Sequence, residues 1–132
     1  MEINIYQVDA FTSNAFSGNP AVVVPDAHVL SDEEMQKIAN ELNVSETAFV
    51  SFLDKDLYEV RYFTPKKEVE LCGHGTIATF YTLALKGYIE PIYNGKKTVY
   101  QVTKAGKLPV EIEFKDNEVK SIIMEVARPR KL

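Results

Sequence analysis

Thr-Ile-Ala-Thr-Phe-Tyr-Thr-Leu-Ala-Leu, residues 76–85, contains no charged side chain and has no polar face. Threonine hydroxyls can bond back to the carbonyl groups of a helix, so these residues are compatible with a helical backbone. A helix that is apolar all round is usually enclosed by protein. Lys86 and Gly87 provide a suitable end, a cation near the last carbonyl groups and a glycine that can adopt the left-handed conformation. We therefore expect a fully buried helix.

Short segments rich in Val, Ile, Phe and Tyr on both sides of this helix predict strands that could cover it. They lie at residues 3–9, 21–24, 47–53, 57–64, 98–104, 108–114 and 119–126. We expect the first to be buried on much of both faces, the pair around the 54–56 turn to form a hairpin, and the last three to be antiparallel. The fold class is then α+β, with about eight short strands in a curled, barrel-like, mixed or antiparallel sheet around a central helix.

A second helix is predicted after residue 31. Ser31 and Glu34 have the spacing of a capping box, in which each side chain satisfies a free N–H group at the helix start. Apolar residues then recur at helical spacing, which indicates one buried face and one exposed face; these residues are Met35, Ile38, Ala39 and Leu42. We expect this helix to end near Asn43.

Composition limits the classes of function. The chain has 132 residues, which suits a single domain over 1–132. Its formal charge of −4 argues against a nucleic-acid or anionic-membrane partner, because both need a basic face. Cys72 is the single cysteine, so no internal disulfide and no multi-cysteine metal site is possible. The sequence shows no secretory signal and no apolar run of membrane-spanning length, so we expect a cytoplasmic protein.

The first candidate site is Glu70–Thr76, at the start of the uncharged helix. Gly73 and Gly75 flank His74, and glycines let a ligand approach the backbone closely. Free N–H groups at a helix start can hold an anion such as a carboxylate. His74 could bond or protonate a substrate oxygen, and Cys72 could act as a base if its thiolate were stabilised. The alternative is a tight turn beside a small core cysteine.

The second candidate is Glu46, which stands between Ser45 and Thr47 where the first helix turns into a strand. A carboxylate buried among small and apolar residues can take and return a proton near neutral pH; the alternative is a surface acid at a loop exit. The third candidate is the segment 17–20, Ser-Gly-Asn-Pro. It could be an ordinary β-turn, or its backbone and the Asn19 amide could orient a polar substrate.

The order of these segments resembles the PhzF family of phenazine-biosynthesis proteins. The similarity lies in residues 8–11 and 17–23, in 35–39 leading to 43–50, in 62–65 and 70–76, and in parts of 103–110 and 124–125. The resemblance implies the diaminopimelate epimerase-like fold, which has two similar lobes. Each lobe is a curled sheet around a central helix, and the active site lies in the cleft between them.

The resemblance also implies an isomerase that moves a proton on a small carboxylated substrate without a metal or other cofactor. The family's best-known member isomerises trans-2,3-dihydro-3-hydroxyanthranilate, and its proton-transferring glutamate aligns with Glu46. His74 and Gly73 match family site residues, with Gly75, Asn19 and Ser45 as substrate-binding neighbours. Racemases of this fold have Gly-Asn after their cysteine, whereas this chain has Gly-His, so we expect Cys72 to line the site rather than to act as a base.

Family members are longer and carry a second lobe with a D-x-A-T-G-S-type segment, which nothing in this sequence matches. The resemblance therefore covers the N-terminal lobe only. Three alternatives remain open. The chain could need a complementary second lobe, it could form a homodimer that rebuilds a cleft, or it could be an inactive binding or structural remnant.

Overall fold

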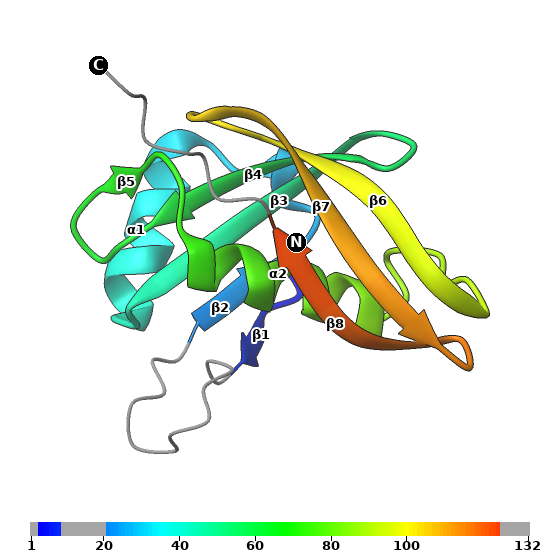
Figure 1. The fold of residues 1–132 in the computed structure, drawn as a ribbon. Helices are drawn as coiled ribbons and strands as arrows, with labels where there is room; N and C mark the ends of the chain where they lie inside the picture. Colours follow the sequence, from blue (N-terminus) through cyan, green and yellow to red (C-terminus); the bar gives the residue numbers. More distant parts are fainter. Residues whose placement is uncertain (1–2, 9–20, 125–132) are drawn as a thin grey trace.

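A computed structural model describes residues 3–8 and 21–124 of the chain (Figure 1). The helical elements are η2, a short 3-10 helix (Ala27–Val29), α1 (Asp32–Leu42) and α2 (Gly73–Leu85). The strands are β1 (Tyr6–Val8), β2 (Ala21–Val24), β3 (Glu46–Asp54), β4 (Leu57–Phe63), β5 (Glu68–Val69), β6 (Asn94–Thr103), β7 (Gly106–Lys115) and β8 (Glu118–Met124).

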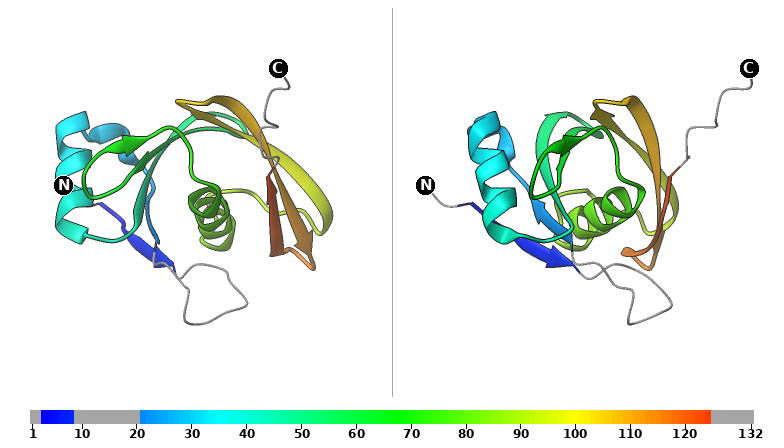
Figure 2. Two further views of the ribbon diagram at one scale, coloured as in Figure 1. Left: turned by 60° about the vertical axis from the view of Figure 1, so that its left-hand side comes forward. Right: turned by 90° about the vertical axis from the view of Figure 1, so that its left-hand side faces the viewer.

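The strands form one mixed sheet in the order β1-β2-β3-β4-β6-β7-β8, with β5 paired to β4. The β3–β4 hairpin and the antiparallel run β6-β7-β8 are confirmed. Two pairs, β2 with β3 and β4 with β6, are parallel. Figure 2 shows the sheet curling around α2, while α1 lies on the outer side. The expected class, a curled mixed sheet wrapped around a central helix, is confirmed.

The sheet has a hydrophobic layer on each face near β3 and β4. Side chains of a strand point alternately to the two faces. Ala48 and Val50 belong to the cluster beside α2, and Phe49 between them belongs to the cluster beside α1. Both layers are buried: Phe49, in the α1 layer, is 1% exposed, and Tyr62, in the α2 layer, is 0% exposed. Because both faces are covered, this part of the sheet holds the residues at its ends in fixed positions.

Helix α1 begins and ends as the sequence predicts. The Ser31 side chain accepts from the Glu34 N–H at 3.1 Å, and Glu34 accepts from the Ser31 N–H at 2.9 Å, which completes the capping box. Asn43 adopts the left-handed conformation, with φ of 52°, and its N–H donates to the Ala39 carbonyl. This tight end turns the chain directly toward β3, whose first residue is Glu46.

Helix α2 starts at Gly73, three residues before the uncharged run, and it ends as predicted. Gly87 has φ of +85°, and the Tyr88 N–H donates to the Leu83 carbonyl at 2.8 Å. The expectation of complete enclosure is wrong on one side, where Leu85 is 58% exposed. The reason is that β1 and β8 do not pair with each other in the described part of the chain, so the curled sheet leaves one side of the helix uncovered.

The first strand differs from its prediction for the same reason. β1 covers only Tyr6–Val8, and it pairs with β2 alone. Tyr6 and Val8 are half-buried and Gln7 is exposed, so the strand is not buried on both faces. An apolar pattern predicted a strand but could not show that it lies at a sheet edge. None of the described helices is long and apolar enough to cross a membrane.

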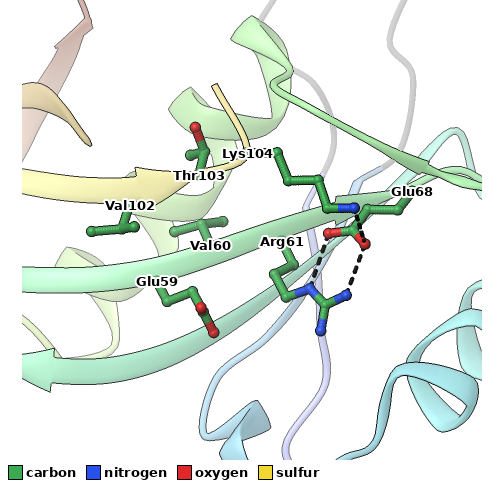
Figure 3. A pocket seen from close by; sticks show the side chains of 7 residues that line it. All are labelled: Glu59, Val60, Arg61, Glu68, Val102, Thr103 and Lys104. Carbon is green, nitrogen blue, oxygen red and sulfur yellow. Dashed lines mark hydrogen bonds and ion pairs between the residues drawn. The ribbon is translucent and has the colours of Figure 1, made fainter. Parts of the chain in front are cut away.

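A cluster of charged side chains joins α1, β4, β5 and the end of β6. Arg61 donates to both carboxylate oxygens of Glu68, at 2.9 and 2.8 Å, and to Asp32 at 2.6 Å. Lys104 lies 3.2 Å from Glu68. Figure 3 shows Arg61 and Lys104 both directed at Glu68, beside a cavity of about 190 Å³. Because these charges are already paired, we assign this cluster a structural role.

Loss of the Glu68 charge should make the fold less stable at neutral pH. The hydrogen bond from Arg61 holds the pKa of the Glu68 carboxyl below its usual value, although burial opposes it. The stabilisation is present above the unfolded-state pKa and is lost as pH falls through the folded-state pKa. Glu68→Gln should therefore lower the free energy of unfolding at pH 7 by about 1–2 kcal/mol and reduce the loss of stability below about pH 5.

Urea unfolding at several pH values measures both effects. Glu118→Gln is the matched control, because Glu118 is exposed. An equal change in the two variants at every pH would contradict the assigned role of the cluster.

Candidate active site

Glu46 lies against the start of α2 rather than on the open surface. It is the first residue of β3, where it pairs with Ala21 of the parallel strand β2. The side chain is half-buried, and its Oε2 atom is shielded from solvent with no hydrogen-bond partner in the described part of the chain. A carboxylate oxygen shielded in this way is costly unless another group meets it. The position suits a group whose partner arrives with a ligand.

Gly75 makes the close approach of Glu46 possible. A Cβ atom on Gly75 would lie 3.0 Å from Glu46 Oε2 and 3.0 Å from two ring carbons of Tyr62. These distances are tighter than most real Cβ contacts, so a side chain here would have to displace the Glu46 carboxylate and the buried Tyr62 ring by a few tenths of an ångström. Gly73 differs, because a Cβ atom there would meet nothing within 4 Å. The backbone at Gly73 is therefore open to an incoming molecule.

Cys72 caps the start of α2, and its thiol faces Glu46. Its Sγ accepts from the Gly75 N–H at 3.3 Å, and its carbonyl accepts from the Thr76 N–H at 2.9 Å. Burial, together with the neighbouring Glu46 carboxylate, raises the pKa of the Cys72 thiol to about 11, although the amides of Gly75 and His74 oppose this. The thiol therefore stays protonated at neutral pH, which favours a lining role over that of a base.

His74 and Ser45 are both exposed next to these residues. His74 lies in the first turn of α2 between the two glycines, and Ser45 directly precedes Glu46. An imidazole and a hydroxyl at these positions can reach a molecule bound at the helix start. Asn19, with the rest of the segment 17–20, lies outside the described residues, so its substrate-binding role remains a prediction.

Sequence reasoning did not connect three buried polar residues behind this site: Tyr62 on β4, Thr76 on α2 and Gln101 on β6, each 0% exposed. Their side chains hydrogen-bond to one another. Burial raises the pKa of the Tyr62 hydroxyl, so it stays neutral. A glutamine two residues after the apolar Val99, and so on the same face of β6, was the available signal, because a buried amide needs partners.

The arrangement brings together a shielded carboxylate, a helix start with an open backbone and an exposed imidazole. Positive charge at a helix start attracts anions. A ligand anion held there would have its neighbouring atoms close to Glu46. The geometry therefore suits proton transfer on a small anionic molecule, and it brings Glu46, Cys72 and Gly75 into one site.

Comparison with known proteins gives consistent results. A family model described as phenazine biosynthesis-like protein, PhzC-PhzF, matches residues 8–131. An uncharacterized isomerase of Clostridium acetobutylicum is 48% identical over 92% of this chain, which covers 39% of that relative. The Bacillus anthracis phenazine biosynthesis protein of the PhzF family is 43% identical, with a TM-score of 0.72 over 89% of this chain and 38% of that structure.

The fold extends to more distant proteins. A hydroxyproline epimerase from Agrobacterium vitis, solved with bound trans-4-hydroxy-L-proline, has a TM-score of 0.68 at 15% identity over 91% of this chain and 39% of that structure. That level of identity shows a shared fold alone. The chain spans about two fifths of the length of the curated relatives that it matches. From its sequence and its fold, the chain belongs to the phenazine biosynthesis-like, or PhzC-PhzF, family.

Proposed function

We propose that this chain carries the proton-transfer half of an isomerase active site, with Glu46 as the acid/base group and a small carboxylated molecule as substrate. One observation carries the proposal: Glu46 Oε2 is shielded, has no hydrogen-bond partner in the described residues and lies against Gly75 at the start of α2. A structural carboxylate at this depth would be expected to have a donor. A catalytic one meets its partner in the substrate complex.

In the proposed reaction, the substrate carboxylate binds at the open helix start around Gly73, and the exposed His74 imidazole donates to a substrate oxygen. Glu46 takes a proton from an acidic carbon, so a C–H bond breaks and an O–H bond forms on the carboxylate. The electron pair moves into the conjugated system of the substrate. Glu46 then returns the proton at another carbon, which restores the carboxylate and leaves the overall composition unchanged.

The cleft needs a second wall, since the residues described here form one side only. We propose that a complementary second lobe, or a second copy of this chain in a homodimer, supplies it. The share of its relatives' length that the chain spans supports this proposal. Closure would exclude water, which strengthens the electrostatic interactions of a charged substrate with the helix start.

Replacing Glu46 should greatly slow proton exchange. In the assembled protein in D₂O, mass spectrometry follows deuterium entering two probes, trans-2,3-dihydro-3-hydroxyanthranilate and trans-4-hydroxy-L-proline. Glu46→Gln keeps the size of the side chain but cannot accept the proton as a carboxylate does. It should slow exchange by about 10²–10⁴-fold. Glu41→Gln, at an exposed position on α1, is the matched control and should exchange at the wild-type rate. Equal rates in both variants, or no exchange into either probe, would contradict the proposal.

The Cys72 thiol should behave as an unreactive group. Because its pKa is raised to about 11, alkylation by iodoacetamide should keep accelerating up to pH 10 without a plateau. Glu46→Gln removes the neighbouring negative charge and should lower the pKa of the thiol. Cys72 is the only cysteine, so the measurement has a single target. A plateau below pH 9 in the wild-type chain would indicate an available thiolate and would favour Cys72 as a base.

Deuterium exchange should depend on the assembly of this chain with a second lobe or a second copy. Size-exclusion chromatography with light scattering gives the mass of each fraction, and each fraction is then tested for deuterium exchange. We expect activity only where the mass exceeds that of one chain, because one lobe leaves the cleft open to water. Exchange by a strictly monomeric fraction would show that no second wall is needed.

A further inference from the structure

Tyr62, Thr76 and Gln101 form a closed set of hydrogen bonds in the core, between β4, α2 and β6. The Tyr62 hydroxyl donates to Gln101 Oε1 at 2.8 Å, Gln101 Nε2 donates to Thr76 Oγ1 at 3.2 Å, and the Tyr62 and Thr76 hydroxyl oxygens are 2.9 Å apart. We call these three residues the core triad. All three are 0% exposed, and the side chains around them are apolar. Three polar groups in a dry core are costly unless every one is satisfied.

The hydrogen atoms of the core triad suffice for one consistent arrangement. Tyr62 donates to the Gln101 carbonyl, Gln101 donates to Thr76, and the Thr76 hydroxyl can donate to Tyr62 or to the Cys72 carbonyl, which is 2.9 Å away. The Gln101 amide is the only member with a separate donor and acceptor. It therefore meets both hydroxyls at once and fixes their separation.

The core triad is attached directly to the candidate site. Thr76 follows Gly75, and its hydroxyl lies beside the carbonyl of Cys72, the cap of α2. The Tyr62 ring packs on Gly75 from the same side as Glu46 Oε2, and both lie 3.0 Å from the Cβ position. A movement of Tyr62 or Thr76 would therefore change the distance between the helix start and the Glu46 carboxylate.

The sequence at the start of α2 is a weak local signal for a helix. Its cap is a cysteine, whose sulfur is a weak acceptor, where most helices have Ser, Thr, Asp or Asn. Glycines occupy its first and third positions, and glycine favours a helix less than alanine does. Tertiary contacts must therefore fix the backbone at the start of α2. The core triad supplies hydrogen bonds there, through the Thr76 side chain.

We propose that Gln101, acting through Tyr62 and Thr76, is a positioning residue that holds the start of α2 at its working distance from Glu46. The role attributed to that distance rests on the function proposed above. Gln101 is distant in sequence from both motifs of the site and touches no substrate. Its amide sets the geometry in which the Glu46 carboxylate and the open helix start face one ligand.

Gln101→Met tests this proposal, because methionine has a similar size and lacks the amide. Its rate of deuterium exchange should fall at least tenfold, mostly in kcat. The alkylation rate of Cys72 at pH 8 should change at least threefold, because the thiol depends on contacts with Gly75 and Glu46. Tyr62→Phe, which keeps the ring on Gly75, should change both rates in the same direction. The double variant should add little to the effect of Gln101→Met, because coupled residues act as a unit.

Val99→Ala is the matched control. Val99 is 0% exposed on the same strand, and its truncation should lower stability without removing a polar group of the core triad. It should leave exchange and Cys72 alkylation within about twofold of wild type. If Gln101→Met and Tyr62→Phe only lower stability, as Val99→Ala does, the core triad is a structural feature and the proposal is wrong. The alkylation rate requires no isomerase activity, so it decides the question even if Glu46 proves not to be the proton-transfer group.

Discussion

The contact of Glu46 and Tyr62 with Gly75 is the constraint on which the rest of the site depends. Glycine is favoured there because a Cβ atom would lie only 3.0 Å from both Glu46 Oε2 and the Tyr62 ring. That packing joins the start of β3 and the last residues of β4 to the first turn of α2. The curled sheet makes it possible, because it covers α2 on the side that carries Gly75, Thr76 and Thr79, all of them buried.

Much of this fold follows from local patterns. The uncharged run 76–85 predicted a helix inside a sheet, and the capping box at Ser31 predicted where α1 begins. Strand pairing over long distances could not be predicted in the same way. β4 and β6 pair in parallel with Tyr58 opposite Gln101, and the Tyr62 hydroxyl reaches the Gln101 side chain from further along β4. No periodicity in either strand reveals this meeting. For the same reason the uncovered side of α2 and the edge position of β1 became visible only in the structure.

In the site, too, local sequence patterns could be recognised, whereas contacts between distant segments could not. The motif containing Gly73, His74 and Gly75 was recognisable because close approach at a helix start needs small residues. Glu46 looks like a surface acid when it is judged alone. Its significance comes from the parallel strand and the helix that shield one of its oxygens. Cys72 could have served as a base at a helix start, but burial and the Glu46 charge keep its thiol protonated. The surroundings of the Glu46 carboxylate and of the Cys72 thiol thus decide which chemistry is open to each.

We propose that Glu46 and the start of α2 act on the same bound molecule. The most direct measurement is a crystal structure of the assembled protein with a carboxylate probe that exchanges deuterium. We expect the probe carboxylate at the backbone of Gly73 and His74, with the exchanging carbon about 3–3.5 Å from a Glu46 oxygen. A probe bound away from α2, or a Glu46 side chain directed away from the exchanging carbon, would contradict it.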